Sequence, residues 1–273
     1  GGLRPRAKLL AQLVIAAIVS IWLYQLHLRI PAGTTLQLPL LGSTISLGVW
    51  FVPLAMLAII GSSNAVNLTD GLDGLAGGCL ITAAAAVAVM VYVAGHAELA
   101  LYLGVTHLPE AGEAVVIAGA MIGGVLSFLW FNCHPAQVFL GDTGSLSLGG
   151  TLGLLAVIAR QELLLLIVGG VFVVEALSVI IQLLSFRLRG RRVFRCAPLH
   201  HHFQFAGWPE NKIVTRFWIV SMLCALVGLG ALKVNSTTDV NRSERMRDSA
   251  ANSSNNSPAV EIAVKLSSSE AGL

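Results

Sequence analysis

The sequence predicts an all-α protein, a polytopic bundle of transmembrane helices. Hydrophobic residues make up 55% of the 273 residues and charged residues only 11%, whereas an average soluble domain carries about 25% charged residues. Apolar runs of about 17 to 21 residues lack Asp, Glu, Lys and Arg, and this is close to the length that crosses a bilayer. These observations exclude a soluble globule, and the net charge of +3 gives no indication of a nucleic-acid partner.

Seven apolar segments are the expected membrane spans of a transmembrane domain over residues 1–232. Each should be helical, because backbone polar groups in hydrocarbon must be paired within the segment. The expected spans cover about residues 9–26, 45–62, 74–94, 114–131, 143–159, 163–186 and 213–232.

Two segments do not fit this pattern of spans. Residues 31–48 alternate loosely and carry turn residues, which fits either a short external hairpin or a plain loop. The tail over residues 233–273 is rich in Ser and Asn and has no apolar run that could span, which is typical of a disordered extension.

The distribution of charge predicts the orientation in the membrane. Alternating loops place residues 1–8, 63–73, 132–142 and 187–212 on one face, together with most of the Lys and Arg that precede the tail. The other face holds Arg29, Arg160 and Lys233. The positive-inside rule therefore makes the first face cytoplasmic, in a bacterial inner membrane, with the C-terminal tail outside.

The first inner loop, residues 63–74, contains two carboxylates and no Lys or Arg. If it is helical, Asn67, Asp70 and Asp73 share one face, because residues three apart are neighbours on a helix. Such oxygen-rich groups suit Mg²⁺, which one or two carboxylates hold together with water and phosphate. The alternative is that an Asp simply caps the helix that starts near Gly74.

The second inner loop, residues 131–144, places Asp142 between Gly141 and Gly144 at the start of a helix. A helix N-terminus favours phosphate, and a carboxylate beside it can hold the metal ion that phosphate brings. The alternative for Asp142 is again an N-cap. Phe139 could stack on a flat base or serve as an interfacial anchor.

The third inner loop, residues 187–216, combines five Arg within residues 187–195 with three consecutive His at 200–202. The Arg side chains fit anionic headgroups or a phosphorylated substrate, and simple positive-inside topology accounts for most of that signal. The His triplet requires a separate explanation, and the candidates are zinc binding, phosphate contact and proton transfer. Anion contact is preferable, because no Cys pair lies nearby. Glu175, inside a predicted span, is either functional or paired with a neighbouring helix.

Carboxylates, a phosphate-binding helix start and a basic loop on one face predict metal-dependent phosphoryl transfer at the membrane surface. Three strings carry a specific resemblance over about residues 1–232: NAVNLTDGLDGLAGG (64–78), QVFLGDTGSLSLGG (137–150) and APLHHHFQFAGWPENKIVTRFW (197–218). They closely resemble the phospho-N-acetylmuramoyl-pentapeptide transferases, within the polyprenyl-phosphate N-acetylhexosamine-1-phosphate transferase superfamily.

This resemblance implies a reaction and a set of roles. Undecaprenyl phosphate would attack the β-phosphate of UDP-N-acetylmuramoyl-pentapeptide, releasing UMP and forming lipid I, a step of peptidoglycan synthesis that requires Mg²⁺. Asp142 would be catalytic and bind the metal, and Asp70, Asp73 and His201 would also be catalytic. The substrate-binding residues would be Asn67, Asn132, Phe139, Gly141, His200 and His202, with Phe139 stacking on uracil. A homodimer is a candidate assembly.

The resemblance also implies about ten helices and an adjacent Asp pair upstream of residue 1, so we expect this chain to hold the last seven helices of a larger enzyme. Three alternatives stay open. One is a sister transferase that uses UDP-N-acetylglucosamine, although the stretch 197–218 points away from it. The second is a catalytically incomplete fragment. The third is a cation-coupled secondary transporter that uses Asp70, Asp73 and Glu175.

Overall fold

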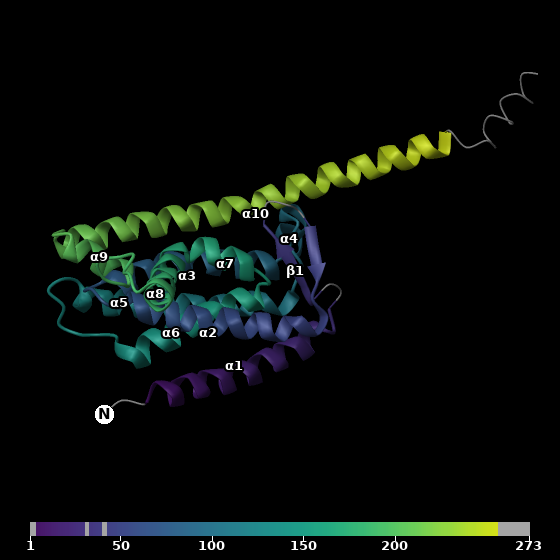
Figure 1. The fold of residues 1–273 in the computed structure, drawn as a ribbon. Coiled ribbons are helices and arrows are strands. Elements are labelled where there is room, and N and C mark those ends of the chain that lie inside the picture. Colours follow the sequence, from purple (N-terminus) through teal and green to yellow (C-terminus); the bar gives the residue numbers. More distant parts are fainter. Residues whose placement is uncertain (1–3, 31–32, 40–42, 256–273) are drawn as a thin grey trace, which may run out of the picture.

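The computed structural model describes residues 4–30, 33–39 and 43–255. In this part of the chain, six helical segments are long and apolar enough to cross a membrane, which confirms an all-α polytopic fold. They belong to α1 (Pro5–His27), α2 (Phe51–Thr69), α3 (Leu75–Gly95), α5 (Ala114–Asn132), α8 (Gly170–Arg189) and α10 (Glu210–Asn255). Figure 1 shows them packed as an elongated bundle with α1 on its outer edge.

One of the seven expected spans, residues 143–159, is corrected by the structure. Residues 143–159 do form a helix, α6 (Gly141–Ile158), but its first half is rich in Gly, Ser and Thr, and it is not among the six apolar spans. The expected span 163–186 is not continuous either. Gly169 separates α7 (Glu162–Val168) from α8, since paired glycines at 169 and 170 have low helix propensity.

The segment 31–48 contains the hairpin, not a plain loop. Strands β1 (Thr35–Leu38) and β2 (Ser43–Ser46) pair antiparallel, with Thr35 opposite Ser46. The hairpin is fastened to the bundle by polar side chains: Arg160 donates to the Thr35 carbonyl, and Gln161 donates to Gln37 at 2.7 Å. The remaining short elements are η1 (Gly48–Trp50), α4 (Ala97–Leu103), η2 (Pro109–Glu113) and α9 (Leu199–Phe205).

Helix α10 continues past the apolar segment that ends near Leu232 and runs to Asn255, 46 residues in all. A disordered extension was expected from residue 233, but the backbone is helical over 233–255. The sequence has no Gly or Pro between Lys233 and Asn255 that would break a helix. The rest of the expected tail, residues 256–273, lies outside the described residues.

Helix α3 lies at the centre of the bundle and is its most buried span. Its core side chains include Leu75, Leu80 and Met90, which are almost fully buried. A helix that is apolar on all sides belongs inside a bundle, and α5, α6 and α10 pack around α3. The contacts of α3 therefore hold the bundle together.

Helices α2 and α6 lie side by side (Figure 1), and glycines let their backbones approach closely. A Cβ on Gly149 would lie 2.7 Å from the Ser62 carbonyl oxygen, and one on Gly153 would lie 2.7 Å from the Ala58 carbonyl oxygen. Small residues four apart are typical of close helix pairs in membranes. This contact fixes the middle of α6 against the middle of α2.

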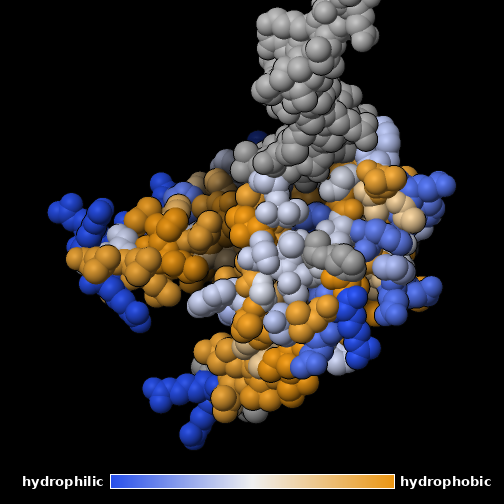
Figure 2. Space-filling model, turned by 90° about the vertical axis from the view of Figure 1, so that its right-hand side faces the viewer, coloured by the Kyte–Doolittle hydropathy of each residue, from blue (hydrophilic) through white to orange (hydrophobic). Residues whose placement is uncertain are grey.

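Apolar side chains cover much of the outside of the molecule. Figure 2 shows orange, apolar surface on two projecting parts, with blue, hydrophilic side chains at their tips. On α1, Leu10, Ile15, Ile18 and Trp22 are all more than half exposed. Outward apolar faces with polar groups near the ends are what a lipid environment requires.

The chain returns repeatedly to the same end of the bundle. The start of α1, the α2–α3 turn, the segment before α6, and the segment from α8 to α10 all lie at one end in Figure 1, with the hairpin and α4 at the opposite end. Among the described residues, 4–8, 63–73, 132–142 and 187–212 therefore lie together at one end, as predicted. All the predicted site residues lie at this end.

Candidate active site

The end of α2 divides the first motif into two parts. The helix ends at Thr69, Asp70 is its C-cap with ψ 53°, and the Gly71 N–H bonds to the Thr69 carbonyl at 2.9 Å. Helix α3 starts only after Gly74, whose φ of 77° favours glycine. The expectation that Asp73 shares a helix face with Asn67 and Asp70 is therefore wrong, because the helix does not reach Asp73.

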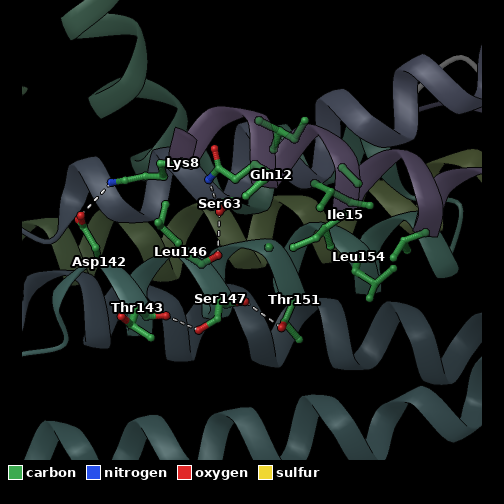
Figure 3. Close-up of a pocket in the computed structure, with 16 residues that line it drawn as sticks. Lys8, Gln12, Ile15, Ser63, Asp142, Thr143, Leu146, Ser147, Thr151 and Leu154 are labelled. Carbon is green, nitrogen blue, oxygen red and sulfur yellow. Dashed lines mark hydrogen bonds and ion pairs between the residues drawn. The ribbon is translucent and has the colours of Figure 1, made fainter. Parts of the chain in front are cut away.

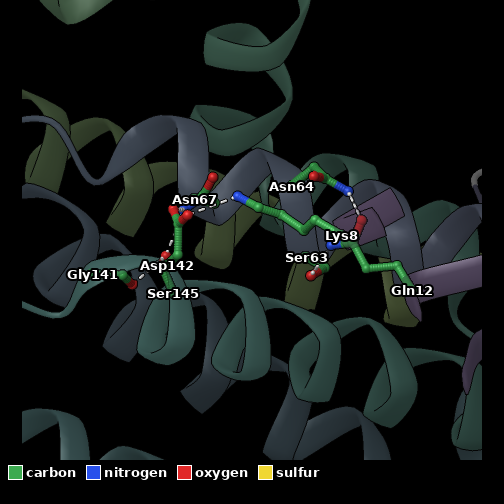
Figure 4. A network of polar contacts seen from close by, with 8 residues as sticks. All are labelled: Lys8, Gln12, Ser63, Asn64, Asn67, Gly141, Asp142 and Ser145. Atoms are coloured by element: carbon green, nitrogen blue, oxygen red, sulfur yellow. Dashed lines mark hydrogen bonds and ion pairs between the residues drawn. The ribbon is translucent and has the colours of Figure 1, made fainter. Parts of the chain in front are cut away.

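Asp142 is the centre of a polar cluster at the start of α6 (Figure 4). Its Oδ1 accepts a hydrogen bond from Asn67 Nδ2 at 2.8 Å, and its Oδ2 pairs with Lys8 Nζ at 2.9 Å. Asn67 Nδ2 also donates to Ser145 Oγ at 2.8 Å, which in turn donates to the Gly141 carbonyl. The cluster thus joins α1, α2 and α6, while the Asp142 side chain stays 66% exposed.

The two carboxyl groups near this cluster differ in acidity. Hydrogen bonds from Lys8 and Asn67, together with the charge of Lys8, hold the pKa of Asp142 below its usual range. Burial, and then the negative charge of Asp142, raise the pKa of Asp70 to about 6. Asp142 is therefore ionised at neutral pH, whereas Asp70 exchanges a proton close to neutrality. Two carboxyl groups whose pKa values differ in this way suit different roles in acid–base chemistry.

The donor atoms of this cluster fit Mg²⁺. Asp142 supplies carboxylate oxygens and Asn67 supplies an amide oxygen, the kinds of ligand that Mg²⁺ takes. Asp70 lies close enough for the charge of Asp142 to raise its pKa. Among the described residues, Lys8 is the only Lys or Arg that forms an ion pair with either carboxylate. A divalent cation would balance the remaining negative charge.

A cavity of about 630 Å³ between α1, α2 and α6 reaches this cluster (Figure 3). Lys8 and Asp142 line one end of it, and the apolar side chains of Ile15 and Leu154 line the other. Ser63, partway along, accepts a hydrogen bond from Gln12 at 3.2 Å. The cavity therefore offers charge at one end and an apolar wall along most of its length.

Asp73 belongs to a second cluster. Its Oδ2 lies 3.1 Å from His134 Nδ1 and accepts from the Ala136 N–H at 3.0 Å. Its own N–H donates to Glu210 Oε1 at 2.9 Å, and Glu210 Oε2 lies 3.9 Å from His134 Nδ1. Asp73 thus ties the segment after α5 to the start of α10.

The second inner loop, residues 131–144, contains a buried residue, Asn132, and an exposed one, Phe139. Asn132 is buried; it accepts from the Gly74 N–H at 3.0 Å and donates to the Val138 carbonyl at 2.7 Å. Phe139 is 74% exposed, and Gly141 has a φ of 62° with open space around it. Asn132 therefore shapes the loop, while the Phe139 ring is free to contact a ligand.

The three histidines have different surroundings. His200 is fully buried against Glu175, with Nδ1 3.1 Å from Glu175 Oε2. His201 Nδ1 lies 2.9 Å from Gln204 Oε1, and His202 Nδ1 accepts from the Arg195 N–H at 3.1 Å. Of the two alternatives for Glu175, pairing with a neighbouring element is the one that forms.

Several residues of these clusters were missed in the sequence: Lys8, His134, Ser145 and Glu210. Lys8 was counted only as one of the basic residues on the inner face. It lies 134 positions from Asp142, so no motif spacing connects the two. The one available signal was the lack of a compensating cation among the acidic residues of the loop 63–74.

Comparison with known proteins places the chain in a family. The model of "Glycosyl transferase family 4" matches residues 1–160. The chain belongs to glycosyl transferase family 4. The match includes Lys8, Asn67, Asp70 and Asp142, so the whole cluster around Asp142 lies within the part that the family shares.

Similar proteins from three bacteria carry the name phospho-N-acetylmuramoyl-pentapeptide-transferase. The chain is 52% identical to those of Desulforapulum autotrophicum and Solidesulfovibrio magneticus and 53% identical to that of Citrifermentans bemidjiense. In each case the similarity covers 85% of this chain but only 64 to 65% of the relative. The chain thus spans about two thirds of the length of these relatives.

Proposed function

We propose that the protein acts in the transfer of phospho-N-acetylmuramoyl-pentapeptide from its UDP-linked precursor to undecaprenyl phosphate, giving lipid I and UMP. The observation that carries the proposal is the cluster of Asp142, Asn67 and Lys8 at the charged end of an apolar cavity. A lipid phosphate has the same division between a charged head and an apolar chain. The names of the similar proteins support the choice of substrates.

In this proposal Asp142 would hold Mg²⁺, with an amide oxygen of Asn67 as a further ligand, and Asp70 stays free as the proton acceptor. The ion would stabilise the charge that develops on the transferred phosphoryl group. Lys8 holds the Asp142 carboxylate and offers a positive charge at the mouth of the cavity for the lipid phosphate. Asp70 takes a proton from that phosphate, and the phosphate oxygen attacks the β-phosphorus while UMP leaves. A pKa of about 6 suits this proton transfer near neutral pH.

The remaining residues would bind the nucleotide and diphosphate. Phe139 stacks on uracil, since its ring is exposed, and Asn132 and Gly141 shape the loop around it. His201 is the proposed catalytic histidine near the diphosphate, and His202 lies beside it. Asp73 supports the same loop through His134 and Ala136.

Two other functions make different predictions. A sister enzyme would take UDP-N-acetylglucosamine, which a competition assay between the two nucleotide substrates decides. A cation-coupled transporter that uses Asp70, Asp73 and Glu175 would carry these groups near the middle of the membrane. Asp70 and Asp73 instead lie in the α2–α3 turn at one end of the bundle, and Glu175 pairs with His200. Ion flux in liposomes that depends on a co-substrate would support transport.

Location and assembly are part of the proposal. The basic residues of α1 and of the segment 187–195 face the end that holds the site, so we place this end in the cytoplasm and the protein in the bacterial inner membrane. A homodimer is the proposed assembly, which native mass spectrometry in a mild detergent measures.

The proposed reaction is tested with membranes from cells that express the complete gene. Added UDP-N-acetylmuramoyl-pentapeptide, undecaprenyl phosphate and Mg²⁺ should yield UMP and a lipid-linked product, and chelation of Mg²⁺ should stop both. Absence of UMP and of the lipid product, in membranes where the protein is shown to be folded, contradicts the proposal.

A further inference from the structure

Glu175 and His200 form a fully buried pair next to the turn that carries Asp70. Both side chains have no exposed area. The two Glu175 carboxylate oxygens each have their own contact: Oε1 accepts from the His200 N–H at 3.1 Å, and Oε2 lies 3.1 Å from His200 Nδ1. A carboxylate only accepts, so Nδ1 is the donor in the second contact. Glu175 thus fixes both the backbone and the ring orientation of His200.

The other edge of the His200 ring faces the turn that carries Asp70. Nε2 is buried and has no hydrogen-bond partner among the described residues. A Cβ on Gly71 would lie 2.3 Å from Nε2, so the ring packs directly against the Gly71 backbone. The position of the turn after Thr69 therefore depends on the His200 ring.

His200 also contacts the next histidine of the chain. The ring centroids of His200 and His201 lie 4.2 Å apart with the planes tilted by 54°. One buried imidazole therefore touches both the turn that holds Asp70 and the ring of His201. The pair joins α8 and α9, which follow each other in the sequence, to the distant end of α2.

We propose that Glu175 is a positioning residue: through His200 it sets the places of Asp70 and His201 and contacts no substrate itself. This rests on the proposed function, in which Asp70 and His201 take part in the reaction. It gives Glu175 and His200 a shared role, in place of the direct substrate contact expected for His200. A displacement of about 1 Å at a reacting group can lower turnover about a hundredfold.

The first test compares Glu175→Gln and Glu175→Asp in the complete protein. We expect kcat for UMP release to fall about 10-fold to 100-fold in Glu175→Gln, with KM for the nucleotide substrate changed by less than about twofold. Glu175→Asp keeps the charge and should recover part of kcat. Wild-type kcat in Glu175→Gln, or a loss that appears only in KM, overturns the proposal.

Glu162→Gln is the matched control. Glu162 is also a buried carboxylate, but it pairs with Arg160 at the end of the bundle that holds the hairpin. We expect it to lower the melting temperature and leave kcat unchanged. An equal loss of kcat in Glu162→Gln and Glu175→Gln would mean that general destabilisation, and not positioning, explains the effect.

A second measurement does not depend on activity. In protein labelled with ¹⁵N-histidine, the His200 Nδ1 proton should give an exchange-protected, downfield NMR signal that disappears in Glu175→Gln. The His201 signals should shift in the same variant and stay in place in Glu162→Gln. If wild-type protein releases no UMP in the activity assay, the proposed function alone is contradicted. If the His201 NMR signals do not move in Glu175→Gln, the positioning role is contradicted.

Discussion

The Asp142 side chain is charged but largely exposed, so its replacement should lower the rate of the reaction without lowering the stability of the fold. Asp142→Asn keeps the shape but removes the charge that Lys8 and the proposed Mg²⁺ balance. We expect UMP release to fall at least about 100-fold, since loss of one electrostatic group in an active site commonly costs that much. The melting temperature of the variant serves as the control and should match the wild type. Turnover within about threefold of wild type would contradict the metal role.

Asp70 predicts the pH dependence of turnover. Its pKa is about 6, above the usual 3.8, so the carboxyl group gains its proton as pH falls through 6. Because the proposed proton acceptor must be ionised, kcat/KM should decline below pH 6. The same raised pKa means that folding favours the protonated form, so this group's contribution to stability is lost as pH rises from about 4 to 6.

The measurement is a pH–rate profile of wild-type protein and Asp70→Asn. The variant should be less active and lack the decline near pH 6. A profile of Asp70→Asn that retains the wild-type decline would assign the titration to another group.

The residues of the site differ in how far the sequence alone reveals them. Asn67, Asp70 and Asp142 stand in short polar motifs between apolar spans, so their types and places were predictable. The partners of these motifs were not. Lys8 joins Asp142 from 134 positions away, and Glu210 joins Asp73 from 137. Such pairs depend on how helices pack, which no local pattern encodes.

At the scale of elements, the close contact of α2 and α6 predicts different effects at neighbouring glycines. An alanine at Gly153 would overlap the Ala58 carbonyl, whereas one at Gly150 would meet Ser63 at an ordinary 3.8 Å. We expect Gly153→Ala to lower the free energy of unfolding by about 1 to 3 kcal/mol. Gly150→Ala is the matched control, and it should be neutral or raise that free energy by up to about 1 kcal/mol.

Unfolding in mixed detergent micelles, followed by circular dichroism, measures both variants. Gly153→Ala should also lower turnover, because it separates Asp142 on α6 from Asn67 on α2. Equal stability of the two variants would show that the helices can move apart at no cost.

Helix boundaries show what apolar patterning misses. It located the helices but did not detect the break at Gly169 or the end of α2 at Thr69. In both places local backbone geometry decides: paired glycines interrupt one apolar run, and a tight turn at Asp70 ends another. The patterning also ended α10 too early, because polar residues without Gly or Pro can extend a helix.

At the scale of the molecule, the cavity between α1, α2 and α6 predicts where the lipid chain lies. Ala11 lines the cavity, whereas Leu10, its neighbour on α1, is 63% exposed and lies outside the lining. Ala11→Trp should raise KM for undecaprenyl phosphate several-fold and leave KM for the nucleotide substrate unchanged, because the indole fills apolar space. Steady-state kinetics with each substrate varied in turn measures this.

Leu10→Trp is the control, since it places the same indole on the outer face of α1. It should leave both KM values unchanged. If both variants raise KM for the lipid equally, α1 as a whole, and not the cavity, controls access.

The fold class and the gathering of three motifs at one end followed from composition and loop order. The cavity did not, because its walls come from three helices whose facing side chains are fixed only by packing. An apolar residue that faces lipid and one that faces a cavity look alike in sequence. Ile15 shows this, since it is 62% exposed and yet lines the cavity.

The main-chain contact at Gly149 and Gly153 also limits which substitutions the sequence of α6 can accept during evolution. The spacing between the middle of α6 and the middle of α2 is set by backbone touching backbone, so no rotamer change can absorb an added side chain. In a library that randomises residues 147–154 and is selected for growth, surviving clones should keep glycine at 149 and 153, whereas position 150, which lines the cavity, should also accept alanine.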